Sequence, residues 1–141
     1  MINAILSKKF NTLKNFGTEN NNIGVPLTLM RLNGNHNIAI LEMGTNHLGE
    51  IRRLSEIARP TMVIITNIGP AHLEYLEDVD TVLKAKLEIK EYMDKEGKII
   101  LNADDESFKT LKTNPRAVWF GFDKEADFYA DKINLEPLGI D

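Results

Sequence analysis

Three short apolar runs, separated by helical segments, constrain the fold of this chain more than any other feature. They cover residues 38–42, 62–66 and 98–102. Apolar residues recur at helical spacing over 50–58, before the second run, and over about 78–96, before the third. Strands that alternate with helices are typical of an α/β domain with a mostly parallel sheet and helices on both faces. The nearly continuous apolar character of the runs predicts strands that are buried on both sides.

Weaker signals complete this order. A short helix is expected over residues 1–6, although no residue before it could serve as an N-cap. Another short helix is expected near Pro26, because proline suits the first turn of a helix. The C-terminal part predicts a short helix over 104–111, a strand over 117–122 and a weak edge strand over 127–135.

The composition supports a folded protein and excludes several classes. With 141 residues, 43% of them hydrophobic and 27% charged, the chain is expected to form one domain over residues 1–141. Its 17 basic and 21 acidic residues give a net charge of −4 without a basic run, which argues against a nucleic-acid partner. No apolar run reaches about 18 residues, the length that crosses a bilayer, so no membrane partner is expected. The absence of cysteine fits a cytoplasmic protein and leaves oxygen and imidazole groups as metal ligands.

Polar residues follow each of the three apolar runs. Glu42 ends the first run, His72 lies shortly after the second and Asn102 ends the third. Ligands of open parallel sheets bind at the carboxyl ends of the strands, so these residues are expected at one edge of the sheet. Each alone has an ordinary explanation as a strand end, a loop histidine or a turn residue. Together, a carboxylate and an imidazole predict a magnesium site beside phosphates.

Lys86 occupies an unusual position in the long predicted helix. The apolar residues Val82 and Ile89 stand four positions before it and three positions after it, on the same face of the helix. Lys84 falls on the opposite side, where a solvated lysine is ordinary. Two explanations of Lys86 are open. Either its stem packs while its ammonium group reaches water or pairs with an acid such as Glu42, or its amine is desolvated and therefore able to lose its proton and react.

Five segments occur in the order and approximate spacing of a known family. They are residues 20–29, 41–44 followed by 49–51, 66–73, 85–88 and 101–105. In these segments the chain resembles the Mur ligases, which are ATP-dependent enzymes of peptidoglycan synthesis. Within that family it is most similar to the branch that adds D-alanyl-D-alanine, and the resemblance extends over essentially the whole chain.

The resemblance implies roles for three of the residues already singled out. In the family, the residues at the positions of Glu42 and His72 bind magnesium. The lysine at the position of Lys86 is carbamylated by carbon dioxide and helps to hold a second magnesium ion. This implies catalytic roles for Lys86 and His72, and it accounts for a lysine on an apolar face, because only a neutral amine attacks carbon dioxide.

The resemblance also implies contacts with nucleotide and substrate. Asn102 lies near the adenine of ATP in such enzymes, and Asn20 and Asn21 belong to a loop that faces the uridine-linked substrate and the γ-phosphate. The family reaction transfers the γ-phosphate of ATP to the carboxylate of a UDP-muramyl tripeptide. The amine of D-alanyl-D-alanine then displaces phosphate from the acyl phosphate, and magnesium neutralises the phosphate oxygens.

The chain matches only one of the three domains of such a ligase. That domain is the central one, with a P-loop-NTPase-like fold, but the chain contains no G-x-x-x-x-G-K-[ST] motif. In the family this loop leads into the helix that corresponds to residues 1–6. We therefore expect an N-terminally truncated central domain that is inactive by itself and needs the missing ligase domains.

Two other functions are compatible with this sequence. A noncatalytic binding module or remnant derived from such a ligase would also lack the phosphate-binding loop. A folylpolyglutamate-synthase-like ligase shares the same core, but the segments 20–26 and 41–44 favour the peptidoglycan enzymes over it.

Overall fold

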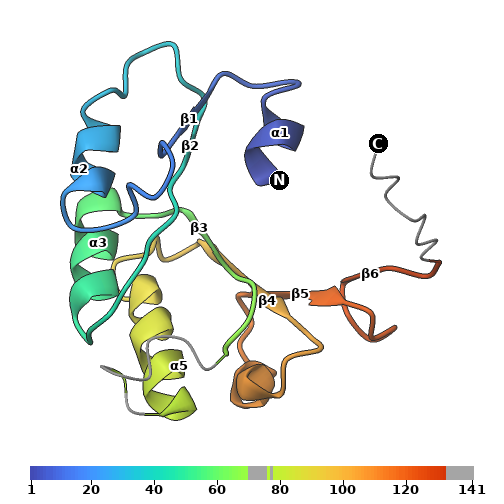
Figure 1. Cartoon of the computed structure of the whole chain (residues 1–141). Helices are drawn as coiled ribbons and strands as arrows, with labels where there is room; N and C mark the ends of the chain where they lie inside the picture. Colours follow the sequence, from blue (N-terminus) through green and yellow to red (C-terminus); the bar gives the residue numbers. More distant parts are fainter. Residues whose placement is uncertain (70–75, 77, 133–141) are drawn as a thin grey trace, which may run out of the picture.

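The computed structural model describes residues 1–69, 76 and 78–132, and in these residues every strand pairing is parallel. The strands form two separate sheets (Figure 1). The small sheet contains β1 (Thr12–Lys14) and β2 (Ile38–Ile40). The large sheet contains, in chain order, β3 (Met62–Ile65), β4 (Lys98–Asn102), β5 (Ala117–Gly121) and β6 (Phe128–Tyr129).

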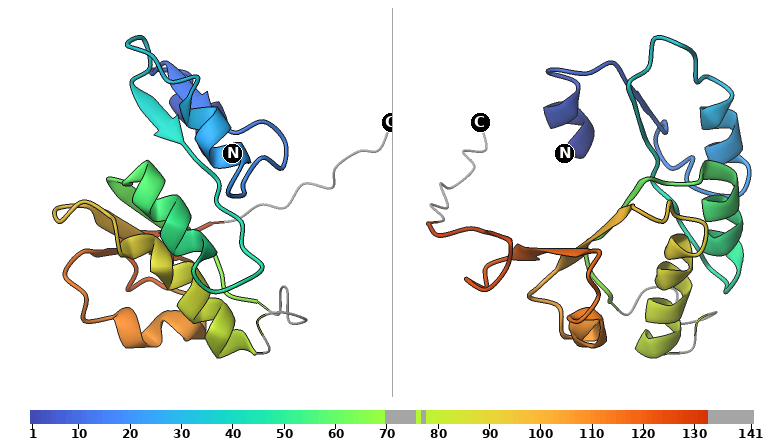
Figure 2. Two further views of the ribbon diagram at one scale, coloured as in Figure 1. Left: turned by 90° about the vertical axis from the view of Figure 1, so that its left-hand side faces the viewer. Right: turned by 180° about the vertical axis from the view of Figure 1, so that it is seen from behind.

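Helices connect most of these strands and confirm the expected α/β class. Figures 1 and 2 show α2, α3 and α5 one after another along one side of the molecule. Within the described residues, none of the helices has the length and apolar character that a membrane span requires. The helices are α1 (Ile2–Leu6), α2 (Gly24–Leu29), α3 (Glu50–Ala58) and α5 (Val79–Leu87), with 3-10 helices η1 (Glu88–Lys90) and η2 (Glu106–Leu111).

Local sequence signals account for several helix ends. Helix α5 begins after Asp78, whose carboxylate accepts a hydrogen bond from the Thr81 amide at 2.7 Å. Helix α3 ends at Ala58, and its C-cap Arg59 has a left-handed φ of 44° and precedes Pro60. Pro26 lies in the first turn of α2, as expected.

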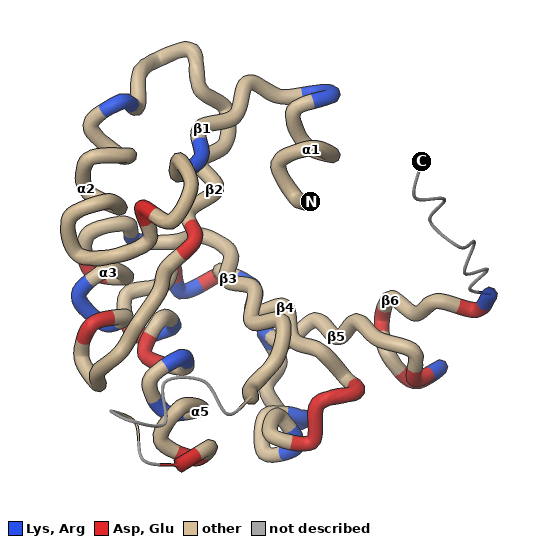
Figure 3. The backbone as a smooth tube through the Cα atoms, in the orientation of Figure 1, with Lys and Arg blue, Asp and Glu red and all other residues tan. Residues whose placement is uncertain are grey.

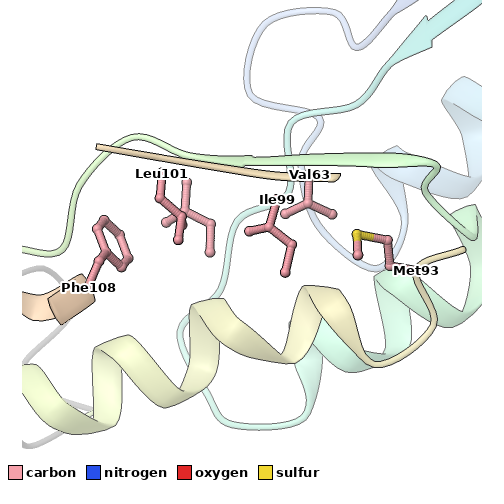
Figure 4. Close-up of a cluster of buried hydrophobic side chains, with 6 residues drawn as sticks. Val63, Met93, Ile99, Leu101 and Phe108 are labelled. Atoms are coloured by element: carbon pink, nitrogen blue, oxygen red, sulfur yellow. The ribbon is translucent and has the colours of Figure 1, made fainter. Parts of the chain in front are cut away.

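The main core lies on one face of the large sheet. Figure 4 shows Val63, Ile99 and Leu101 pointing from the strands toward the helix formed by α5 and η1. Phe108 of η2 closes one end of this cluster and Met93 the other, and Phe108 is fully buried. The alternation of buried and exposed side chains along β3 and β4 explains why only every second residue takes part.

The prediction that the strands are buried on both sides is wrong. On the opposite face of β3, the side chains of Met62 and Ile64 are 57% and 38% exposed. An apolar residue in a strand indicates a face that could be buried, but the sequence of the strand does not specify whether another element covers that face. The large sheet is therefore a half-buried one, with a single packed face in the described residues.

The prediction of a single sheet is also wrong, since β2 pairs with β1 and not with β3. Strand β1 was not predicted, because its three residues include only one buried side chain, Leu13, and show no period. Strand β2 stops at Ile40 instead of continuing to residue 42. Past that point the backbone of Glu42 bonds to the side chain of Asn15 instead of to another strand.

Two further elements are shorter than predicted. The long helix expected to about Glu96 ends as η1 at Lys90. A turn at Asp94 takes its place, in which the Asp94 carbonyl accepts the Gly97 amide at 3.0 Å and the Asp94 amide donates to Pro60. The edge strand expected over 127–135 is limited to Phe128–Tyr129, and residues 133–135 lie outside the described residues.

Candidate functional site

A cleft of about 220 Å³ opens where β1 and β2 end. One wall is the loop between β1 and α2, and the other is the loop between β2 and α3. Because the two strands are parallel, both loops leave the same edge of the small sheet. Most of the lining is amide or hydroxyl groups, which suit a polar ligand; the lining residues are Asn20, Asn21, Asn22, Gly44, Thr45, Asn46 and Glu50.

Glu42 and Asn20, two of the predicted site residues, are in direct contact. The Asn20 side-chain Nδ2 donates to Glu42 Oε1 at 2.8 Å, and the Asn20 carbonyl accepts the Gly44 amide at 2.7 Å. A Cβ on Gly44 would lie 2.9 Å from the Asn20 side chain, so this approach requires glycine. The structure therefore joins the asparagine loop to the acid that follows β2.

Asn15 anchors both loops from below and was missed as a site residue. Its side chain is buried, with 8% of the residue exposed. Asn15 Oδ1 accepts the Glu42 amide at 2.7 Å, while Nδ2 donates to the Glu19 carbonyl at 2.5 Å and the Glu42 carbonyl at 3.4 Å. The available signal was an asparagine directly after a strand, but β1 itself was not predicted.

Asn21 is largely committed to its own backbone. Its Oδ1 accepts the amides of Ile23 and Gly24 at 3.0 and 2.9 Å, which starts helix α2. A Cβ on Gly24 would stand 2.6 Å from the backbone of Glu19, so the loop folds tightly over the helix start. Asn21 still lines the cleft, but its side-chain oxygen is already bonded to the backbone at the start of α2.

Glu50 organises the second wall of the cleft. Its Oε2 accepts hydrogen bonds from the Thr45 hydroxyl at 3.0 Å and from the amides of Asn46 and His47 at 2.7 and 3.1 Å. The bond from Asn46 lowers the pKa of Glu50 most, and burial opposes that effect. The sequence predicted Glu50 only as a helix start and did not single out Thr45 or Asn46, because side-chain bonds within a loop leave no periodic pattern.

Glu88 fixes the start of α3 beside this cleft. Its carboxylate accepts the Gly49 amide at 2.8 and 2.9 Å and the Arg52 amide at 3.2 Å. These amides belong to the N-terminal end of α3, where an anionic acceptor is favoured. Glu88 therefore connects the end of α5 to the start of α3, which contains Glu50 and follows the loop with Thr45.

Lys86 lies half-buried in the last turn of α5, and Lys84 is exposed, as the sequence pattern predicted. Lys86 Nζ donates to the Asn67 carbonyl at 2.9 Å. Burial lowers the pKa of Lys86, and the negative charge of Asp105 partly opposes this. The acid that acts on Lys86 is thus Asp105 and not Glu42, which corrects the pairing considered from sequence.

Asp105 ties the loop after β3 to the start of η2. Its Oδ2 accepts the Ile68 amide at 2.6 Å, and its Oδ1 accepts the Ser107 amide at 2.9 Å. Burial alone would raise the pKa of Asp105. The bonds from Ile68 and Ser107 and the charge of Lys86 lower it by more than burial raises it, so the pKa lies below its usual value. Asp105 therefore remains ionised next to the Lys86 amine at neutral pH.

Asn102 lies at the end of β4, beside a second hollow of about 580 Å³. Its Oδ1 accepts the Asp104 amide at 3.0 Å, and an acidic run, residues 104–106, follows the strand (Figure 3). Aromatic side chains dominate the hollow, which is lined by Asn102, Asp104, Phe120, Gly121, Phe122, Phe128, Tyr129 and Ala130.

The expected single edge with Glu42, His72 and Asn102 is not observed. Glu42 follows a strand of the small sheet and Asn102 ends a strand of the large one, so the two do not share a sheet edge. His72 lies outside the described residues. Within the part of the chain that the structure describes, no group of three acidic or imidazole side chains gathers around one point. The metal-binding roles of Glu42, Lys86 and His72 therefore stay predictions.

Comparison with known families identifies this arrangement. The family model of the Mur ligase middle domain matches residues 1–140. The chain belongs to the Mur ligase family, and the expected class of fold and the expected resemblance are both confirmed.

Curated relatives extend this result. The chain is 37% identical over 145 residues to the UDP-N-acetylmuramoyl-tripeptide–D-alanyl-D-alanine ligase of Escherichia coli K12, covering 100% of this chain and 32% of that protein. The ligase of the same name from Bacillus subtilis 168 is 40% identical over 105 residues, which are 74% of this chain and 23% of that protein. The chain thus spans about a third or less of the length of these relatives.

Solved structures show the same relation. MurF from Acinetobacter baumannii superposes with a TM-score of 0.87 at 33% sequence identity, over 95% of this chain and 30% of that one. MurF ligase from Thermotoga maritima, solved in complex with ADP, superposes with a TM-score of 0.78 at 25% identity, over 86% of this chain and 29% of that one.

Proposed function

We propose that this chain supplies the central, ATP-binding part of a ligase that joins D-alanyl-D-alanine to UDP-N-acetylmuramoyl tripeptide through an acyl phosphate. The observation that carries the proposal is the half-buried Lys86, held against Asn67 with its pKa lowered. The names of the relatives and the ADP in the Thermotoga maritima structure support the substrates and the nucleotide. The other domains of the ligase and a cytoplasmic location are part of the proposal.

The residues present fit magnesium in kind. Glu42 offers a carboxylate oxygen at the surface, and magnesium prefers few protein ligands beside phosphates and water. We assign Glu42, His72 and a carbamate on Lys86 to the metal ions, which would neutralise the phosphate oxygens. Asn20 and Asn21 would face the γ-phosphate and the uridine-linked substrate, and Asn102 the adenine.

The environment of Lys86 supports carbamylation. The neutral amine adds to carbon dioxide, forming an N–C bond and releasing one proton, and the product carries an anionic carboxylate. Burial favours the neutral amine that this step needs. The Asn67 carbonyl fixes the nitrogen, since it accepts one of its hydrogens at 2.9 Å. Lys86 can thus change from a cation to an anionic ligand without leaving its place in α5.

A test uses this chain and carbon-13-labelled carbon dioxide. In bicarbonate buffer at about pH 8, the chain should show a carbamate carbon signal by NMR. Lys86→Met should remove the signal, whereas Lys84→Met, a change of the same kind at an exposed position two residues away, should keep it. A signal of equal intensity in the Lys86→Met variant would remove the proposed role of Lys86.

A second test concerns the whole reaction. We predict that the chain by itself releases no phosphate from ATP in the presence of the muramyl tripeptide and D-alanyl-D-alanine. The reason is that it contains no phosphate-binding lysine loop to satisfy the phosphate charge. Phosphate release above the background of a sample without protein would overturn this part of the proposal.

A further inference from the structure

We propose that Asn15 is a positioning residue that holds Glu42 where its carboxylate meets Asn20. The positioning itself follows from the contacts of Asn15. Its importance for a metal ion rests on the proposed function, because that function assigns Glu42 to magnesium.

The side chain of Asn15 continues the β1–β2 pairing beyond the point where the backbones separate. The last backbone pair of the ladder is Lys14 with Ile40. Two residues after Ile40, both backbone polar groups of Glu42 turn to Asn15: the amide donates to Oδ1 at 2.7 Å, and the carbonyl accepts from Nδ2 at 3.4 Å. A side-chain amide therefore replaces the missing strand partner and fixes the backbone of Glu42.

The same side chain also fixes the opposite wall of the cleft. Asn15 Nδ2 donates to the Glu19 carbonyl at 2.5 Å, next to Asn20 in the sequence. Asn20 then contacts the Glu42 segment at two points, Glu42 Oε1 and the Gly44 amide. Because one buried amide bonds to both walls, it sets the separation between Glu42 and Asn20.

The difference in burial explains why Asn15 controls this contact. Asn15 is buried, whereas Glu42 is exposed and is restrained mainly through these hydrogen bonds. An apolar residue of similar size at position 15 would leave the Glu42 amide and the carbonyls of Glu19 and Glu42 without this partner. The segment would then move to find water, and the carboxylate would lose its fixed place.

Asn11 provides a matched control at the other end of β1. Its Nδ2 donates to the Asn35 carbonyl at 2.9 Å, and its backbone amide donates to Asn37 Oδ1 at 3.0 Å. It therefore also connects the flanks of β1 and β2 through an asparagine amide, but it is exposed and does not line the cleft. A variant of Asn11 tests whether loss of any such bridge has the same effect.

The experiment compares Asn15→Leu with Asn11→Leu in the full chain, using Glu42→Gln as the reference for a lost carboxylate. The side-chain NH₂ resonances of Asn20 report the bond to Glu42 directly and need no metal. We expect Asn15→Leu to move these resonances to the values seen in Glu42→Gln, and Asn11→Leu to leave them unchanged. A magnesium titration followed on the same resonances should show a dissociation constant about tenfold higher in Asn15→Leu and unchanged in Asn11→Leu.

The two readouts separate the inference from the proposed function. If magnesium does not perturb the native chain, the assignment of Glu42 to the metal fails, but the Asn20 resonances still decide the role of Asn15. Native Asn20 resonances in folded Asn15→Leu would overturn the inference. Should Asn15→Leu be unfolded, Asn15→Asp replaces that variant in the comparison, because the aspartate keeps an acceptor for the Glu42 amide. If both variants are unfolded while Asn11→Leu folds, Asn15 is a general structural residue and the inference is wrong.

Discussion

The two sheets of this protein are stabilised by different kinds of contact. The large sheet packs six buried apolar side chains on one face, among them the fully buried Leu101 and Phe108. The small sheet has three residues per strand. Leu41 and Met43, which follow β2, pack against a cluster that has three buried side chains among the described residues, Val25, Ile51 and Leu54. Asparagine amides at both ends of β1 supply much of the remaining pairing.

This difference indicates a division of labour. Apolar burial contributes most of the free energy of folding but does not aim individual polar groups. Hydrogen bonds contribute less net free energy, but their preferred distances and angles restrain how groups such as Glu42 and Asn20 lie relative to each other. We therefore expect substitutions in the large sheet to change stability and substitutions around the small sheet to change the cleft.

The largest effect should come from the same substitution in the two clusters. Leu101→Ala and Leu54→Ala each remove a side chain with 0% exposure, and each should lower the free energy of unfolding by about 2–5 kcal/mol. Leu101 should lie at the upper end of this range, because its cavity opens inside the larger cluster. Urea denaturation measures both values, and a greater loss for Leu54→Ala would contradict the proposed ranking.

Glu88→Gln tests the connection between the two regions. The change removes the charge that faces the amides of Gly49 and Arg52, and we expect a loss of about 1–2 kcal/mol in the free energy of unfolding. Glu91→Gln removes an exposed charge three residues away and serves as the control. If the two variants have the same stability, Glu88 does not fix the start of α3.

A pH titration of stability tests Asp105 in the large-sheet region. The pKa of Asp105 is lower in the folded chain than its usual value near 3.9. The ionised group therefore stabilises the fold at pH values above about 4, and this contribution is lost as the pH falls through the folded pKa. Asp105→Asn should reduce the dependence of unfolding free energy on pH between about 5 and 2. An unchanged acid transition would show that the bonds from Ile68 and Ser107 do not favour the ionised carboxylate.

The smallest effect on stability is expected for Gly44→Ala. A Cβ at residue 44 would meet the end of the Asn20 side chain at 2.9 Å, and that side chain can move away. The cost should therefore stay below about 1 kcal/mol, while the Asn20 amide leaves Glu42 and its NMR signal shifts. Gly34→Ala adds the same methyl group where no atom lies within 4 Å and should leave that signal in place. An unmoved Asn20 signal in Gly44→Ala would show that the cleft wall adapts instead.

The elements with a strong period were predicted well from the sequence. Strand β4 and helix α3 have the expected bounds, and α5 begins where the helical spacing begins, directly after Asp78. These elements bury alternate or helically spaced side chains against a core, so their apolar residues recur in the sequence at the period of a strand or a helix. Strand β1 shows no such pattern, because Leu13 is its only buried side chain.

The candidate site was predicted in part for the same reason. The pattern identified Glu42 and Lys86, since each is a charged residue at the edge of, or within, an apolar pattern. Asn15 and Asn46 could not be found in this way, because each acts through hydrogen bonds between a side chain and a backbone group. The side chain of Asn15 bonds to the backbone of Glu42, 27 residues away, and the backbone amide of Asn46 donates to the Glu50 carboxylate, four residues away. Such bonds depend on the path of the loops, which the sequence period does not describe.

The carboxylate of Glu88 has a mechanical consequence for the proposed chemistry. It accepts amides at the start of α3 from a position two residues after Lys86, so charge-assisted hydrogen bonds join the end of α5 to the start of α3. Glu50 is the first residue of α3, so a ligand that displaces the start of this helix would strain the hydrogen bonds to Glu88. The wall of the cleft that contains Glu50 therefore has a direct hydrogen-bonded connection to the turn that follows Lys86.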